Sequence, residues 1–97
     1  MILLEIPSAY QNGYEFLLFE QDSEINLSSP LAEISVYRMD SIFEKILPRL
    51  LVCVKKKASF DLNEREIEKM LERELLFQKD EVEIQFTYII EGIQSEL

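Results

Sequence analysis

The sequence predicts an α+β fold, a two-layer sandwich in which a mixed four-stranded sheet carries two helices on one face, in the order β-β-α-β-α-β. An Asn-Gly pair at residues 12 and 13 separates two apolar runs, which is typical of a hairpin. An apolar run at 49–57, a helical pattern at 62–77 and an alternating pattern at 81–90 form a strand-helix-strand unit. Only two glycines and three prolines occur in 97 residues, so we expect regular elements, short loops and a single domain spanning 1–97.

The first two elements are expected to be strands joined by a tight turn. Ile2 to Ile6 is a short apolar run, and Tyr14 to Glu20 is the expected return strand. The Asn12-Gly13 pair suits a type I′ turn because both central residues of that turn need a positive φ. Residues 21–29 are mostly polar and predict a loop.

The segment 30–47 is ambiguous between helix and strand. A stripe of apolar residues at helical spacing follows Ser29-Pro30, and it consists of Ala32, Val36, Met39, Phe43, Ile46 and Leu50. This stripe favours a helix from about Pro30 to Leu47. The alternative is a strand at 33–38 followed by a short helix at 42–47, because residues 33–37 are partly β-type and Ser41 precedes Glu44 by three positions. Pro48 ends either version.

The second half is expected to form the strand-helix-strand unit. Arg49 to Lys57 predicts a strand, and Asp61 is expected to cap the helix, whose buried stripe is Ile67, Met70, Leu71 and Leu75. In the last strand apolar residues alternate with mostly polar ones, so we expect one face in the core, with Phe86 at its centre. The single cysteine, Cys53, lies in an apolar run and is expected to be a buried thiol.

The composition excludes several kinds of chemistry. The chain has no histidine and one cysteine, so it lacks Ser-His-Asp and Cys-His catalytic systems and zinc sites made of Cys and His. It also has no glycine-rich phosphate loop. We therefore expect no enzymatic activity, no metal and no cofactor. The lack of a disulfide, a leader sequence and a long apolar run predicts a cytoplasmic protein that does not bind membranes.

The net charge of −9 indicates the class of partner. It disfavours direct nucleic-acid binding, because phosphate groups are repelled at long range. Residues 1–48 hold eight acidic and two basic residues, and the acids are densest between Glu15 and Glu24, beside several aromatic residues. Carboxylates steer a basic protein toward such a surface, and aromatic side chains anchor it. The partner-binding residues predicted on this basis are Tyr10, Tyr14, Glu15, Glu20, Asp22 and Glu24.

These observations predict a small acidic binding protein that inhibits or neutralises a basic, nucleic-acid-processing partner, as immunity proteins, antitoxin-like proteins and phage inhibitors do. The alternative is an accessory or assembly subunit that acts through homo- or hetero-oligomerisation, a homodimer included. The final strand would serve this role, because Ile89 interrupts its otherwise polar face. The salt dependence of partner binding distinguishes the two hypotheses, because salt screens electrostatic steering but hardly weakens an apolar interface.

Overall fold

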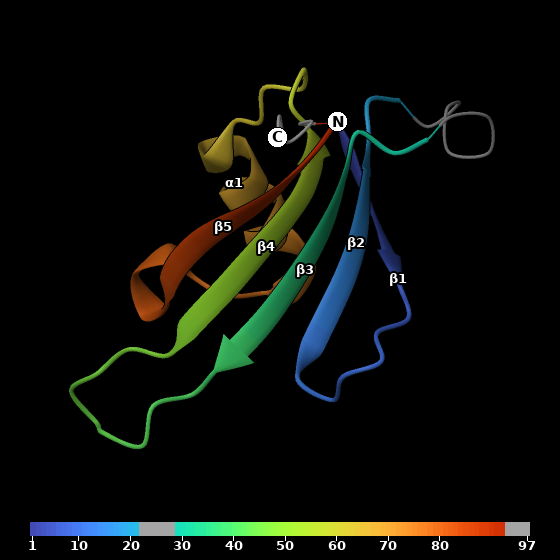
Figure 1. Cartoon of the computed structure of the whole chain (residues 1–97). Helices are drawn as coiled ribbons and strands as arrows, with labels where there is room; N and C mark the ends of the chain where they lie inside the picture. Colours follow the sequence, from blue (N-terminus) through green and yellow to red (C-terminus); the bar gives the residue numbers. More distant parts are fainter. Residues whose placement is uncertain (22–28, 93–97) are drawn as a thin grey trace, which may run out of the picture.

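The computed structural model describes residues 1–21 and 29–92 as a five-stranded sheet with one helix packed against one of its faces (Figure 1). The strands lie in the order in which they occur along the chain. An antiparallel meander is formed by β1 (Ile2–Ile6), β2 (Gly13–Phe19), β3 (Ala32–Met39) and β4 (Arg49–Lys57). The helix α1 (Glu64–Leu75) and the short 3₁₀ helix η2 (Lys79–Glu81) then lead to β5 (Glu83–Glu91), which pairs with β4 in parallel.

The core lies between α1 and one face of the sheet. Because side chains alternate along a strand, the core residues of β2, β3 and β4 occupy every second position in the middle of these strands. These residues are Phe16, Leu18, Ala32, Ile34, Val36, Leu50, Val52 and Val54. The helix contributes Ile67, Met70 and Leu71, which confirms the predicted buried stripe, while Leu75 packs at its border. No other helix or strand of the described chain covers the opposite side of the sheet, which we call the uncovered face.

The α+β class is confirmed, and so is the strand-helix-strand unit of β4, α1 and β5. The expected numbers of strands and helices are wrong, because residues 30–47 do not form a helix. They form β3 and a hairpin loop at 40–48, in which Ile46 donates its N–H to the Phe43 carbonyl at 3.2 Å. The alternative strand at 33–38 is therefore confirmed, but the short helix at 42–47 is not formed. Pairing with β2 on one side and β4 on the other satisfies the backbone of β3, and this outweighs the helical spacing.

The hairpin of β1 and β2 is present, but the expected type I′ turn is wrong. Neither Asn12 nor Gly13 has a positive φ, and the turn is closed by Gly13, which donates its N–H to the Tyr10 carbonyl at 3.2 Å. Glycine suits position 13 because neighbouring side chains pack closely against it. A Cβ there would lie 3.1 Å from the Ser8 Oγ and 3.2 Å from a ring carbon of Tyr37. The loop that follows β2 was expected at 21–29, and residues 22–28 lie outside the described chain.

Two other local expectations need correction. Asn63, not Asp61, caps α1, because its Oδ1 accepts a hydrogen bond from the Glu66 N–H at 3.3 Å. Phe86 packs against the core but is only half-buried, since β5 is an edge strand with no strand beyond it.

Candidate functional site

The uncovered face carries apolar and charged side chains in adjacent rows across the sheet. The register places Leu4, Leu17, Glu33, Lys55 and Ile89 in one row across all five strands. The next row is Ile6, Glu15, Ser35, Cys53 and Thr87. Ile89 is 53% exposed and Leu4 is 37% exposed. A face with this mixture has apolar area to bury against a partner and charges that determine which partner fits.

These two rows surround a shallow hollow of about 400 Å³, which we call the face hollow. Its polar lining comes from Glu15, Glu33, Ser35, Cys53 and Lys55. Apolar lining comes from residues of the β1 end, from Leu17 and from Ile89. The ionisable lining therefore has two carboxylates and one ammonium group, together with a thiol.

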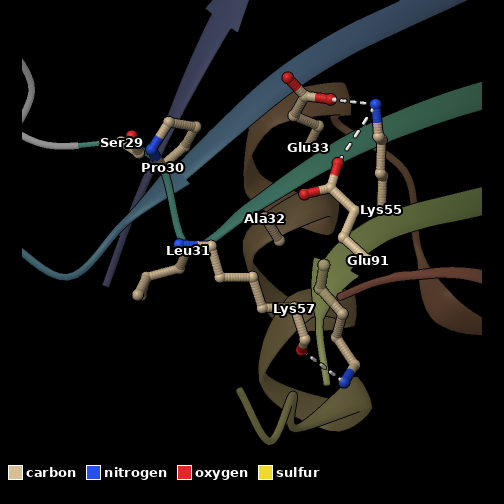
Figure 2. Close-up of a pocket in the computed structure, with 9 residues that line it drawn as sticks. Ser29, Pro30, Leu31, Ala32, Glu33, Lys55, Lys57 and Glu91 are labelled. Carbon is tan, nitrogen blue, oxygen red and sulfur yellow. Dashed lines mark hydrogen bonds and ion pairs between the residues drawn. The ribbon is translucent and has the colours of Figure 1, made fainter. Parts of the chain in front are cut away.

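Lys55 is held by two carboxylates (Figure 2). Its Nζ lies 3.2 Å from the Glu91 Oε1 and 3.8 Å from the Glu33 Oε2. The hydrogen bond to Glu91, and then the charges of Glu91 and Glu33, raise the pKa of the Lys55 ammonium above its ordinary value. Lys55 and Glu33 also line a second hollow of about 240 Å³, formed with residues 29–32 and Lys57. Because two acids share one base here, Lys55 does not neutralise the rest of the face hollow.

Glu15 belongs to a cluster at the other side of the face hollow. Ser35 donates its hydroxyl to the Glu15 Oε2 at 2.6 Å, and no basic side chain within residues 1–21 and 29–92 pairs with this carboxylate. The Tyr10 and Tyr37 rings meet edge to face, with centroids 5.7 Å apart and planes at 71°. Burial raises the pKa of the Tyr37 phenol, and the nearby Glu15 carboxylate raises it further. An unpaired carboxylate beside two tyrosine rings suits a lysine or arginine of a partner.

The four predicted partner-binding residues that lie in the described part of the chain do not form one surface. Tyr10 and Glu15 lie near each other, because both approach Tyr37. Tyr14 is on the side of the sheet opposite to Glu15, since neighbouring strand residues face opposite ways, and it is 38% exposed. Glu20 follows the far end of β2, roughly 17 Å from Glu15 at about 3.4 Å per residue. Asp22 and Glu24 lie outside the described residues.

A second candidate surface is the tip of the β3–β4 hairpin, which extends beyond the end of the sheet (Figure 1). We call its exposed apolar side chains the apolar tip, and they are Met39, Ile42, Phe43, Ile46 and Leu47. Ile42 is 90% exposed and Phe43 is 62% exposed. The β1–β2 loop lies at the same end of the sheet, where the Asn12 carbonyl accepts a hydrogen bond from the Arg38 N–H at 3.3 Å.

This end of the sheet concentrates the exposed apolar area of the described chain. Seven of its twelve exposed large apolar or aromatic side chains lie there, namely the apolar tip together with Tyr10 and Tyr14. Exposed apolar side chains gathered at one end of a domain make that end a candidate surface for contact with a partner.

The sequence analysis missed the apolar tip and the role of Tyr37 and Ser35. Met39, Phe43 and Ile46 were assigned to the buried stripe of the expected helix, which would have placed them in the core. A usable signal was the run of β-type residues at 34–37, because a strand there turns residues 40–48 into a hairpin tip.

Cys53 differs from its expected position. It is half-buried on the uncovered face and lines the face hollow. The reason is the alternation of β4, in which Val52 and Val54 point toward α1 and Cys53 points to the opposite side.

Comparisons with models of protein families, with curated proteins and with solved structures found no match. Function is therefore inferred from the side chains of the chain itself. Within residues 1–21 and 29–92, no helix is both long and apolar enough to span a membrane. The described residues also contain no group of three or more Cys, Asp or Glu side chains placed to hold a metal ion.

Proposed function

We infer that the chain is a small acidic protein-binding domain that neutralises a basic, nucleic-acid-processing partner. The apolar tip anchors the partner, and the carboxylates of the uncovered face select a basic one. The observation that carries this proposal is the concentration of exposed apolar side chains at one end of the sheet, next to the Glu15 cluster.

The apolar tip supports binding to a protein because of its shape and its surroundings. A hairpin that projects beyond the sheet can enter a cleft that a flat surface cannot reach. The tip itself is close to neutral, because Asp40 pairs with Arg38 and Glu44 is followed by Lys45, but the whole chain has a net charge of −9. Charge of this sign is repelled by anionic lipid surfaces, so the charge pattern favours a protein cleft over a membrane.

The uncovered face supports a basic partner. Glu15 has the Ser35 hydroxyl as its partner, and Lys55 is already held by Glu33 and Glu91. An arginine or lysine entering beside Tyr10 and Tyr37 would therefore meet a carboxylate that no described cation neutralises. Proteins that process nucleic acids have basic clefts, and a compact acidic domain can occupy such a cleft in place of phosphate groups.

The test is affinity capture from the native cell extract with the tagged chain, followed by mass spectrometry. The bait is compared with the variant Ile42→Ser/Phe43→Ser. Both side chains are exposed, so this change should leave the free energy of unfolding within about 0.5 kcal/mol. We expect the wild-type chain to retain a basic protein that the variant loses. The chain should then reduce the nucleic-acid-processing activity of the captured protein.

A control variant tests whether the loss of capture is specific to the apolar tip. Leu76 is 88% exposed just after α1 and is not part of the apolar tip, so Leu76→Ser removes exposed apolar area from outside the tip. This control should capture the same protein as the wild type. The proposal is wrong if the tip variant still captures it, or if the captured protein is acidic.

A second candidate function, an assembly subunit, is favoured by the outer edge of β5, which pairs with no further strand in the described chain.

A further inference from the structure

The two edges of the sheet differ in how well they are protected against pairing. β1 has five residues, contains Glu5 and is followed by Pro7, and short, charged or proline-flanked edges discourage pairing. β5 has nine residues, and from Ile84 to Ile90 it contains no charged residue, no proline and no glycine. Its register with β4 runs through all nine residues without a bulge. The β5 edge therefore lacks the usual protection along its central seven residues.

The direction of the free backbone groups on β5 follows from its contacts at both ends. Glu83 donates its N–H to the Pro48 carbonyl at 2.9 Å, and the Glu91 carbonyl accepts from the Ala58 N–H at 3.3 Å. The odd-numbered residues therefore turn their backbone toward β4. Because backbone groups alternate in direction along a strand, Ile84, Phe86, Tyr88 and Ile90 turn theirs outward, away from the sheet.

We propose that β5 pairs antiparallel with β5 of a second copy of this chain, about a two-fold axis at Thr87. This register uses all nine residues and places Phe86 opposite Tyr88 of the second copy, and Ile84 opposite Ile90. All four residues have outward backbone groups, so they form the hydrogen-bonded pairs of the new ladder, on the order of eight bonds. Phe86 and Tyr88 already stack within one chain, with centroids 6.4 Å apart, and the second copy would extend this stack.

Charge favours a second copy at this edge. In the proposed register Glu83 lies opposite Glu91, but each acid brings a base from its own chain. Arg49 Nε lies 3.6 Å from the Glu83 carboxylate, and Lys55 Nζ lies 3.2 Å from that of Glu91. The acids at the ends of the interface are therefore partly compensated, and β5 itself carries no charge between Ile84 and Ile90. For a chain of net charge −9, this edge is where two strands can approach with less repulsion than at a charged edge.

The two-fold arrangement also closes the assembly. Both β5 edges are then paired, and the edges left in the described part of the sheet are the two copies of β1, which are short and protected. The result is a ten-stranded sheet with both uncovered faces on one side and the two apolar tips at opposite ends. This dimer does not depend on the proposed function, because it leaves the apolar tip and the face hollow accessible.

The first test is the mass of the chain in sedimentation equilibrium. The wild type should give twice the 11.5 kDa of a single chain. Gln85 of one copy lies opposite Ile89 of the other, so Gln85→Lys/Ile89→Lys sets ammonium groups against each other at two places. Gln85→Lys/Ile89→Glu sets an ammonium group against a carboxylate at the same places. The first variant should raise the dimer dissociation constant about tenfold or more relative to the second.

The second test determines the register between the two β5 strands, by oxidation of single-cysteine variants in a Cys53→Ser background. Cys53 is replaced because it lies beside Thr87 in the β4–β5 register. At the two-fold axis the Thr87 Cα atoms would lie about 4.5 Å apart, within the range for a disulfide. The two Gln85 positions would be roughly 13 Å apart. Thr87→Cys should therefore form an intermolecular disulfide and Gln85→Cys should not.

Each outcome decides the proposal. A wild-type chain that remains at 11.5 kDa at its highest concentration overturns it. So does a dimer that the two double variants affect equally, or one in which both cysteine variants cross-link to the same extent. Thermal unfolding of each variant verifies that it is folded, so that a lost dimer is not mistaken for a lost fold.

Discussion

Replacing Ile34 and Phe43 one at a time tests whether residues 30–47 form a strand and a hairpin tip. In β3, Ile34 is fully buried between sheet and helix, whereas Phe43 is 62% exposed on the apolar tip. Ile34→Ala deletes a buried side chain and should lower the free energy of unfolding by about 2–5 kcal/mol. Phe43→Ala removes a mostly exposed ring and should change it by about 0.5 kcal/mol or less.

The loss expected for Ile34→Ala is a large part of the free energy of unfolding of such a domain, which is about 5–15 kcal/mol. Urea unfolding followed by circular dichroism gives both values, with the slope against urea concentration showing whether unfolding stays two-state. A helix from 30 to 47 would produce the opposite order, because Phe43 belongs to the helical stripe and Ile34 does not. A larger loss for Phe43→Ala than for Ile34→Ala would therefore refute the strand and the exposed tip together.

Two further predictions concern the helix and one tyrosine. Asn63→Ala should lower the free energy of unfolding by about 1 kcal/mol in urea melts, because Asn63 caps α1. Asp61→Ala should have a much smaller effect, and equal losses for the two variants would contradict the cap assignment. Burial, and then the hydrogen bond from the Tyr88 hydroxyl to Glu64, raise the pKa of Tyr88 to about 12. Because the folded chain holds this proton more tightly than the unfolded chain, the contribution of Tyr88 to stability is complete below about pH 10 and is lost as the pH rises through about 12. Tyrosinate absorbance measures the titration, and Glu64→Gln should lower this pKa; an unchanged titration would show that Glu64 does not hold the hydroxyl.

The sequence was sufficient to predict those strands and helices whose hydrophobic pattern fits only one type of secondary structure. The strand β4 was predicted with its observed bounds, because its apolar run is followed by three lysines, and β5 was predicted from the alternation of apolar with mostly polar residues. The helix between them was expected because its stripe follows one face only. Its cap was misassigned, since Asp61 and Asn63 are both good capping residues and nothing in the sequence ranks them.

Residues 30–47 could not be resolved, because Ala32 and Val36 share a face both in a helix and in a strand. What decides the outcome is hydrogen bonding of β3 to strands on both sides, and this depends on residues far along the chain. The same limit applies to the candidate site. Tyr10 and Glu15 could be singled out as an aromatic and an acid, but their partners Tyr37 and Ser35 are known only once the register of β2 and β3 is known.

The most direct test of the proposed function is the binding kinetics of the captured partner at low and high salt. Glu15→Lys should slow association several-fold at low salt and have little effect at about 0.5 M, where the Debye length is only a few Å. Phe43→Ser should leave association nearly unchanged and accelerate dissociation at both salt concentrations, because an apolar anchor is not screened. If Glu15→Lys has no effect at low salt and Phe43→Ser leaves dissociation unchanged, neither the face hollow nor the apolar tip is the binding surface.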